Sequence, residues 1–280
     1  MNNIKKSQHY VWKNYLKPWT ANGQIYCLRD GKVFKTSPDN IAQQSYFYKS
    51  NPINIEEINL ANYYIGIFDP AVKELLSSML RIYHITANND DYLMKCGIED
   101  FHGIVETNFI PVLTKLYEVD LSFFGSSKEK SDFSFFIGCQ YSRTNNMRSR
   151  FITSEITYPK NVDKENFAKI FSLFSAAIIG NWVYSKAKQQ FLVNKTGEPF
   201  ITGDQPVFNL KGTDSMEIAP SEFELFYPIS PSQAIILSEK NTQPLMEIED
   251  IEKVKWFNRK IWKNANEQIY AKYEENLKVK

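Results

Sequence analysis

The sequence predicts an α+β fold, predominantly helical, in a single domain over residues 1–280, with an N-terminal β-hairpin and a small C-terminal antiparallel sheet. Helical periodicity fills the middle of the chain, and short alternating apolar runs lie near both ends. No linker, internal repeat or low-complexity tract divides the chain. With 280 residues, 43% of them hydrophobic, it can bury one large core.

The N-terminal hairpin is predicted from two alternating runs, 24–28 and 32–35, that flank Asp30-Gly31. An Asp-Gly pair favours a tight hairpin turn because both residues tolerate a positive φ. A second turn is expected over residues 37–40. The aromatic residues 46–48 after it form a candidate edge strand.

Apolar residues spaced three and four apart predict the first helices. One begins near Ile55, and the next begins at Pro70 with Asp69 as its N-cap. Residues 90–117 are expected to be helical in two pieces, because Gly103 and Pro111 interrupt the pattern.

Three further helices are predicted in the second half of the chain. Residues 133–150 are expected to form one helix, residues 163–190 a central buried helix, and residues 248–273 an amphipathic closing helix. Short strands are expected at 191–193, before Asp204, and at 223–229 and 233–237. Asp204 is therefore predicted at a strand end, where side chains often face clefts.

Composition excludes several classes of protein. The formal charge of +1 gives no global field for nucleic acid or an anionic membrane. The three cysteines share no short spacing, which argues against both a disulfide framework and a zinc site. No signal peptide precedes the first helix, and no apolar run reaches the roughly 20 residues of a membrane span. We expect a cytoplasmic protein.

The helix predicted over residues 133–150 carries polar groups on its inward side. Phe133, Phe136 and Ile137 define the apolar stripe, and Gln140, Arg143 and Thr144 continue it. An unsatisfied neutral group costs roughly 1 to 3 kcal/mol to bury, and a charge costs more. The stripe therefore predicts a polar partner elsewhere in the chain.

Arginine is also concentrated in this region. Only six of the 33 Lys and Arg residues are arginines, and Arg143, Arg148 and Arg150 fall within eight positions. Guanidinium groups suit planar recognition of carboxylate or phosphate. The cluster thus indicates either an anion site or a buried ion pair.

Short runs along the whole chain resemble a bacterial family known as domain-of-unknown-function family 4238, DUF4238. The opening His9-Tyr10-Val11 is similar to the family's His-Tyr-Val-Pro motif, with Trp12 in place of proline. The remaining similar positions are Tyr15-Leu16-Lys17, Ser37-Pro38, Phe47-Tyr48, Gln140, Arg143, Thr144, Arg148, Phe200-Ile201-Thr202, Asp204, Pro206-Val207, Phe226 through Pro231, Asn258 and Asn264-Ala265. The resemblance implies no established activity.

The resulting hypothesis is a phosphate-handling hydrolase, nuclease-like or directed at nucleotides. His9 and Asp204 are the candidate catalytic residues, and Gln140, Arg143 and Arg148 the candidate substrate-binding residues. The expected substrate is a phosphorylated small molecule or RNA. Walker, dinucleotide-binding, serine-hydrolase and zincin motifs are absent from the sequence. The sequence therefore does not identify a cofactor, and a divalent cation is one of the options.

Two alternatives compete with this hypothesis. In the first, the protein is a non-catalytic binding or accessory module, with a buried Arg143–Asp204 ion pair bridged by Gln140 and with His9 in a structural role. In the second, the edge at residues 46–48 recognises a peptide. Both catalysis and the ion pair predict that Asp204 lies near Arg143.

Overall fold

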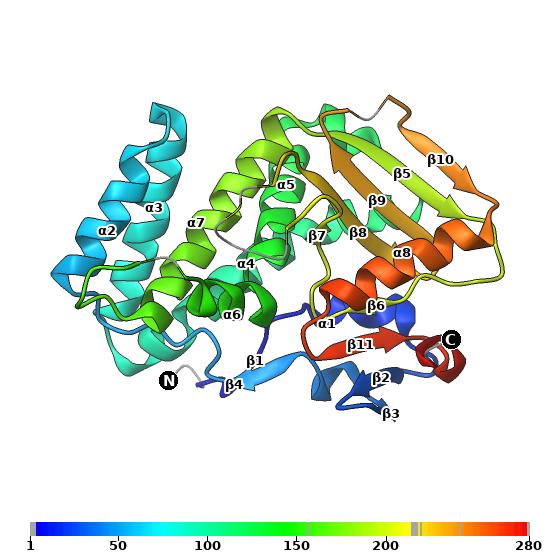
Figure 1. Cartoon of the computed structure of the whole chain (residues 1–280), viewed down its shortest axis with the longest axis horizontal. Coiled ribbons are helices and arrows are strands. Elements are labelled where there is room, and N and C mark those ends of the chain that lie inside the picture. Colours follow the sequence, from blue (N-terminus) through cyan, green and yellow to red (C-terminus); the bar gives the residue numbers. More distant parts are fainter. Residues whose placement is uncertain (1–3, 156, 214–217, 219, 241, 279–280) are drawn as a thin grey trace.

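The computed structural model describes residues 4–155, 157–213, 218, 220–240 and 242–278, and it has the predicted α+β architecture. Its α-helices in the described residues are α1 (Lys13–Leu16), α2 (Ile55–Gly66), α3 (Pro70–Ala87), α4 (Asp91–Tyr117), α5 (Ser127–Ser142), α6 (Asn145–Thr153), α7 (Lys164–Ser185) and α8 (Ile251–Asn264). Helices α2 to α7 form one half of the molecule, and the two larger sheets with α8 form the other (Figure 1).

The described strands form three sheets. They are β1 (Ser7–His9), β2 (Ile25–Arg29), β3 (Lys32–Thr36), β4 (Gln43–Ser45), β5 (Lys188–Asn194), β6 (Thr202–Gly203), β7 (Phe208–Asn209), β8 (Glu224–Ser230), β9 (Gln233–Ser238), β10 (Leu245–Ile248) and β11 (Gln268–Ala271). The sheet orders are β1-β4, β10-β5-β9-β8-β7 and β3-β2-β11-β6. The C-terminal sheet is antiparallel as predicted, except that β10 pairs with β5 in parallel at its edge.

The predicted hairpin is confirmed. Asp30 and Gly31 have φ values of 52° and 72°, as a two-residue hairpin turn requires. The hairpin is part of a larger sheet, because β2 also pairs with β11, which comes much later in the sequence. The candidate edge strand at residues 46–48 is wrong. Tyr46 turns with a φ of 50°, and Phe47 and Tyr48 are buried.

Helix α3 begins at Pro70 with Asp69 as its N-cap, as predicted. Helix α4 is one helix rather than two. Pro111 lies on its exposed side, and buried Phe109 and Val112 hold the helix against the core on either side of the proline.

The prediction of a single helix over residues 133–150 is wrong, because this segment contains parts of two helices, α5 and α6. Helix α5 ends with Arg143 as its C-cap, and Thr144 is the N-cap of α6, where its hydroxyl accepts the Met147 N–H at 3.3 Å. Gln140, Arg143 and Thr144 therefore lie at a helix junction. They do not form one continuous stripe.

Two helix ends also differ from prediction. Residues 188–190 belong to β5, and the closing helix ends at Asn264, so that residues 268–271 form β11. In both cases the strand is set by pairing with distant strands. All four residues of β11 are buried, so its sequence lacks the alternation of apolar and polar residues that would predict a strand.

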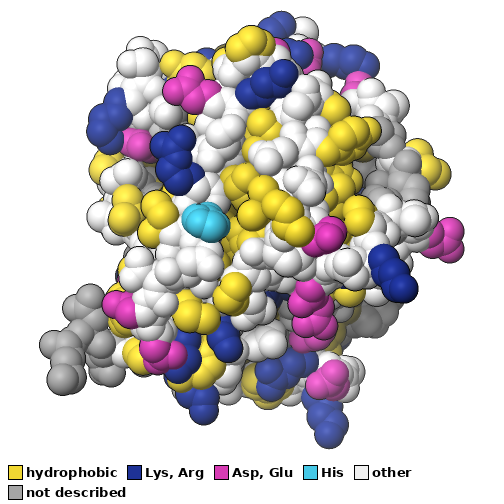
Figure 2. Space-filling view, turned by 90° about the vertical axis from the view of Figure 1, so that its left-hand side faces the viewer, with side chains coloured by type: hydrophobic (Ala, Val, Ile, Leu, Met, Phe, Trp, Pro, Cys, Tyr) yellow, Lys and Arg dark blue, Asp and Glu magenta, His cyan; other side chains and the backbone are white. Residues whose placement is uncertain are grey.

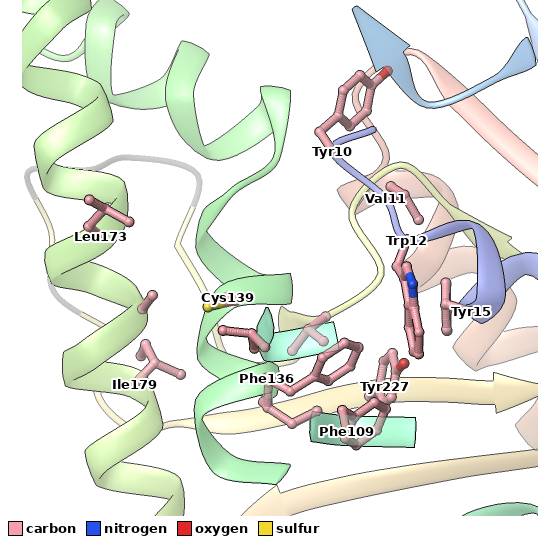
Figure 3. Packing of buried hydrophobic residues seen from close by; sticks show 14 of the residues in the cluster. Tyr10, Val11, Trp12, Tyr15, Phe109, Phe136, Cys139, Leu173, Ile179 and Tyr227 are labelled. Carbon is pink, nitrogen blue, oxygen red and sulfur yellow. The ribbon is translucent and has the colours of Figure 1, made fainter. Parts of the chain in front are cut away.

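The five-stranded sheet is covered on both faces. Leu225 and Tyr227 on β8 contribute to the core beneath the helices, whereas Phe226 packs with Phe257 of α8. Figure 3 shows part of the main core, where Trp12 and Phe109 gather around Phe136. The rings of Phe109 and Phe136 stack with centroids 3.7 Å apart. These contacts fix the N-terminal segment onto α4 and α5.

Helix α7 crosses the middle of the helical half and packs closely on α5. A Cβ on Gly138 would lie 2.1 Å from the Ala176 carbonyl oxygen, so only glycine permits this approach. By length and composition alone α7 could cross a membrane. It is mostly buried here, as the core helix of a soluble protein is.

The face on the side of α2 and α3 is shown in Figure 2, where hydrophobic side chains gather toward the middle and charged ones toward the rim. The exposed large hydrophobic residues of these two helices are Ile55, Tyr63, Leu75 and Ile85, and Ile67, the C-cap of α2, is exposed as well. The rest of the described chain therefore leaves part of this helical pair uncovered.

Candidate functional site

Asp204 follows β6, as predicted, but its side chain is buried and faces backbone. The carboxylate accepts the N–H groups of Asn266, Glu267 and Gln268 at 2.7, 2.8 and 3.1 Å. Burial raises the pKa of Asp204 to about 6, and the three N–H groups act in the opposite direction. The carboxylate is thus committed to holding the segment that leads into β11.

Arg143 is buried and pairs with a carboxylate other than Asp204. Its Nη2 donates to Glu106 Oε1 on α4 at 2.7 Å. Gln140, with its amide turned so that Oε1 faces Arg143, accepts from Nε at 3.1 Å and from Nη2 at 2.5 Å. The predicted ion pair of Arg143 with Asp204, bridged by Gln140, is therefore wrong, and Gln140 contacts Arg143 alone of the two.

The residue that joins the helix junction to the strand end is Gln205. Its side chain accepts from the Thr144 hydroxyl and donates to the carbonyls of Tyr141 and Val207 at 2.9 and 2.6 Å. The polar partner predicted for the helix stripe thus exists one residue beyond Asp204. Sequence analysis missed it because a glutamine after an aspartate carries no distinctive signal.

Arg148 lies on α6 and is turned away from Asp204. It donates from Nη1 to the Phe47 carbonyl at 3.0 Å, and its Cζ lies 3.8 Å from the centre of the Phe47 ring. Both Arg143 and Arg148 lower the pKa of the buried His102 ring, after the larger effect of burial. The two arginines therefore lie around the same histidine, which sequence analysis did not select.

His9 ends β1 and lies apart from the other predicted site residues. Burial, followed by Lys13 and Lys5, lowers the pKa of His9 to about 4. Its Nε2 is buried without a hydrogen-bond partner among the described residues. The five predicted residues thus do not meet in one place, since only Gln140 and Arg143 contact each other directly.

A polar pocket of about 240 Å³ opens beside Gln205, between α6 and α8. We call it the α6–α8 pocket. Its lining residues are Tyr141, Asn146, Met147, Arg150, Gln205, Phe208, Asn209, Leu210, Gly212, Thr213, Lys260, Lys263 and Asn264. The charged groups among these described residues are all cationic, namely Arg150, Lys260 and Lys263.

Hydrogen bonds fix the walls of the α6–α8 pocket. Asn146 donates to the Asn264 carbonyl at 2.8 Å and so ties α6 to the end of α8. Arg150 donates from Nη2 to the Thr213 carbonyl at 2.6 Å. Lys260 lies over the Trp256 ring, with Nζ 5.2 Å from its centre. The cationic groups are therefore held on two different helices around one hollow.

A second hollow of about 250 Å³ adjoins this pocket. The two share the lining residues Tyr141, Met147, Arg150, Asn209, Gly212 and Thr213. The residues that line only the second hollow are Phe171, Ser175, Ile178, Ile179, Ile218, Pro220 and Phe223. Its lining is mainly apolar. A ligand spanning both hollows would place a charged group beside Arg150 and an apolar group beyond it.

A larger hollow of about 950 Å³ lies beside α8 and Tyr273. Its lining has both signs of charge, with Glu198 and Glu275 as well as Lys255 and Arg259. Asn258 in its wall is committed to the backbone of Pro199 and Ile201. The mixed lining of this hollow therefore favours neither an anionic nor a cationic ligand, whereas the cationic groups of the α6–α8 pocket favour an anion.

Residues 7–173 and 176–275 match the family model described as "Protein of unknown function (DUF4238)". The chain belongs to this family. No curated protein and no solved structure matches it. In this DUF4238 member, the family-like residues Gln140, Arg143 and Asp204 are all buried and hydrogen-bonded within the protein.

The described residues of this DUF4238 protein include no ready metal site. Among the described residues, no group of three or more His, Cys, Asp or Glu side chains could hold a metal ion. Cys27, Cys96 and Cys139 are free and buried, and burial raises the pKa of each thiol.

Proposed function

We propose that the protein binds a small phosphorylated ligand in the α6–α8 pocket. The observation that carries this proposal is the convergence of Arg150, Lys260 and Lys263 on one hollow whose described lining has no carboxylate. Guanidinium and ammonium groups are the side chains that proteins use for phosphate. A volume of about 240 Å³ is just below the roughly 300 to 1,000 Å³ of typical small-molecule pockets.

The adjoining apolar hollow suggests what the rest of the ligand is. Phe171, Ile178 and Phe223 line the adjoining hollow but not the polar pocket. A phosphate monoester with an aromatic or apolar group would fill both hollows. A nucleoside monophosphate and an aryl phosphate both meet this description. We also propose the cytoplasm as the compartment, in keeping with three free thiols.

Binding is better supported than hydrolysis. A general acid or base must reach the ligand within hydrogen-bond distance, directly or through one water. The described lining of the pocket has no histidine or carboxylate. Nuclease-like hydrolysis with His9 and Asp204 as the catalytic pair remains a prediction, and RNA or nucleotide turnover tests it.

The experiment is calorimetric titration of the protein with inorganic phosphate, phenyl phosphate and adenosine monophosphate at low ionic strength. We expect phenyl phosphate and the nucleotide to bind more tightly than phosphate. Arg150→Met and Lys260→Met should each weaken binding by about tenfold or more, the loss of one charged hydrogen bond. Lys253→Met, which removes an exposed charge from the same helix α8, is the matched control and should bind as the parent does.

Two results would overturn the proposal. One is the absence of binding by the folded parent protein. The other is an equal weakening by Lys253→Met and Lys260→Met, which would mean that general charge attracts the ligand. Phosphorus NMR of the same mixtures follows hydrolysis separately, so a protein that binds without turnover is distinguished from a hydrolase.

A further inference from the structure

Two half-buried cationic side chains, those of Arg148 and Lys169, line a small cleft that is separate from the α6–α8 pocket. The cleft is lined by Tyr48, Tyr83, Ile98, His102, Arg148, Lys169, Ser172 and Leu173. Arg148 comes from α6 and Lys169 from α7. Neither forms an ion pair with a carboxylate among the residues that the structure describes.

The hydrogen bonds of these two cations go to backbone carbonyls. Arg148 donates to Phe47 O at 3.0 Å, and Lys169 Nζ donates to Lys49 O at 2.7 Å. A guanidinium has five N–H donors and an ammonium has three, so most donors of both groups are not used by these two bonds. Burial and then the repulsion of Arg148 lower the pKa of Lys169 to about 8.

Asp163 and Glu165 raise the pKa of Lys169 from outside the cleft, whereas the polar groups that line the cleft carry no negative charge. The Tyr83 hydroxyl donates to Asn166 at 2.5 Å, and the Ser172 hydroxyl donates to the Ser142 carbonyl at 2.9 Å. His102 is 3% exposed, and its Nδ1 has no partner in the described protein. An unpartnered buried nitrogen beside two cations is a second, independent sign that something occupies the cleft.

The size of the cleft limits what can enter. Its volume of about 10 Å³ corresponds to one water-sized sphere. A phosphate or sulfate ion is too large, whereas a monatomic anion is close to the size of water. Two like charges that line one cleft repel each other, and a bound anion offsets that repulsion more strongly than a neutral water molecule does.

We propose that the cleft between Arg148 and Lys169 binds one halide ion, chloride under ordinary conditions. The ion bridges α6 to α7, and it is held by donors of both cations. This site is separate from the α6–α8 pocket and does not depend on phosphate binding there.

Thermal unfolding tests the proposal at one fixed ionic strength, with sodium gluconate replaced stepwise by sodium chloride. The Tm of the parent should rise by a few degrees as chloride is added, because an ion that binds only the folded state stabilises it. Lys169→Met should lose this rise. Lys160→Met, which removes an exposed charge outside the cleft, is the matched control and should keep it.

A crystal structure in sodium bromide gives a second, independent measurement. We expect an anomalous bromide peak between the Arg148 guanidinium and the Lys169 ammonium. The proposal is overturned if the parent shows no dependence on chloride, if Lys169→Met keeps the full dependence, or if the cleft holds water without bromide. The crystal structure of the parent decides the matter even where Lys169→Met fails to fold.

Discussion

Asp204 and Gln268 are joined by two hydrogen bonds, one between their backbones and one from the Gln268 backbone to the Asp204 carboxylate. The Asp204 N–H donates to the Gln268 carbonyl at 3.0 Å, and the Gln268 N–H donates to Asp204 Oδ2 at 3.1 Å. The N–H groups of Asn266 and Glu267 complete the arrangement. A residue at the end of one strand thereby fixes where another strand begins, which is a structural role for the carboxylate.

We expect Asp204→Asn to lower the free energy of unfolding by roughly 3 kcal/mol at pH 7. The amide keeps the shape of the side chain, but its NH₂ group faces backbone N–H donors and leaves at least one of them unsatisfied. Such a buried donor costs about 1 to 3 kcal/mol, and the bonds to a charged acceptor are stronger than average. Urea unfolding followed by circular dichroism measures the change.

The matched control is Glu267→Gln, which removes a neighbouring exposed charge but keeps the backbone N–H that binds Asp204. It should change the free energy of unfolding by less than about 0.5 kcal/mol. Equal effects of the two substitutions would mean that charge, and not the hydrogen bonds, carries the contribution of Asp204.

Arg143→Met should destabilise the protein by roughly 3 kcal/mol, because it leaves Glu106 partly buried without its partner. Glu106→Gln should cost less, since Gln140 still accepts from the guanidinium. In a double-mutant cycle, we expect the coupling energy between residues 143 and 106 to exceed about 1 kcal/mol. Additive effects would show that the two side chains contribute independently.

His9 should make the protein less stable in acid. Its folded-state pKa of about 4 is below the ordinary 6.5, so protonation favours the unfolded chain. Its contribution is fully present above pH 6.5 and is lost as the pH falls from 6.5 to 4. The stability difference between the parent and His9→Gln, measured by urea unfolding at pH 7.5 and 5, should therefore shrink in acid. A constant difference would contradict the burial of the neutral ring.

Gly138→Ala should cost about 3 kcal/mol or more, because the new methyl group would lie 2.1 Å from the Ala176 carbonyl oxygen and force α5 away from α7. Gly103→Ala is the matched control in α4, where no atom lies within 4 Å of the added Cβ. It should stabilise the protein by up to about 1 kcal/mol through helix propensity. Thermal melts of both variants compare them directly.

Local sequence signals predicted the elements that depend on their own residues. The Asp30-Gly31 turn and the Asp69-Pro70 helix start depend on backbone preferences and capping within a few positions, and both are present. The break between α5 and α6 was missed, although Thr144 is a good N-cap, because the helical three- and four-residue spacing of the stripe continues through Gln140, Arg143 and Thr144. Periodicity alone does not distinguish one helix from two helices that keep the same buried side.

Long-range pairing accounts for most of the other differences. Residues 268–271 form a strand because β2 and β6 flank them, and neither neighbour is close in sequence. The partner of Arg143 is Glu106 of α4, 37 positions away, and no local pattern indicates it. Charged residues in the last turns of α8 fit a solvated helix face equally well, so the α6–α8 pocket emerges only when α6 is placed beside them.

The sheet order β3-β2-β11-β6 also has a consequence for synthesis of the chain. The β2–β3 hairpin is synthesised before helices α2 to α7, but β11, which separates that hairpin from β6, is synthesised after all of them. Helices α2 to α7 can pack while translation continues. The hairpin must wait with one edge of β2 open until residue 271 emerges, so a nascent chain stopped before that point exposes unpaired strand edges to proteases and to other nascent chains.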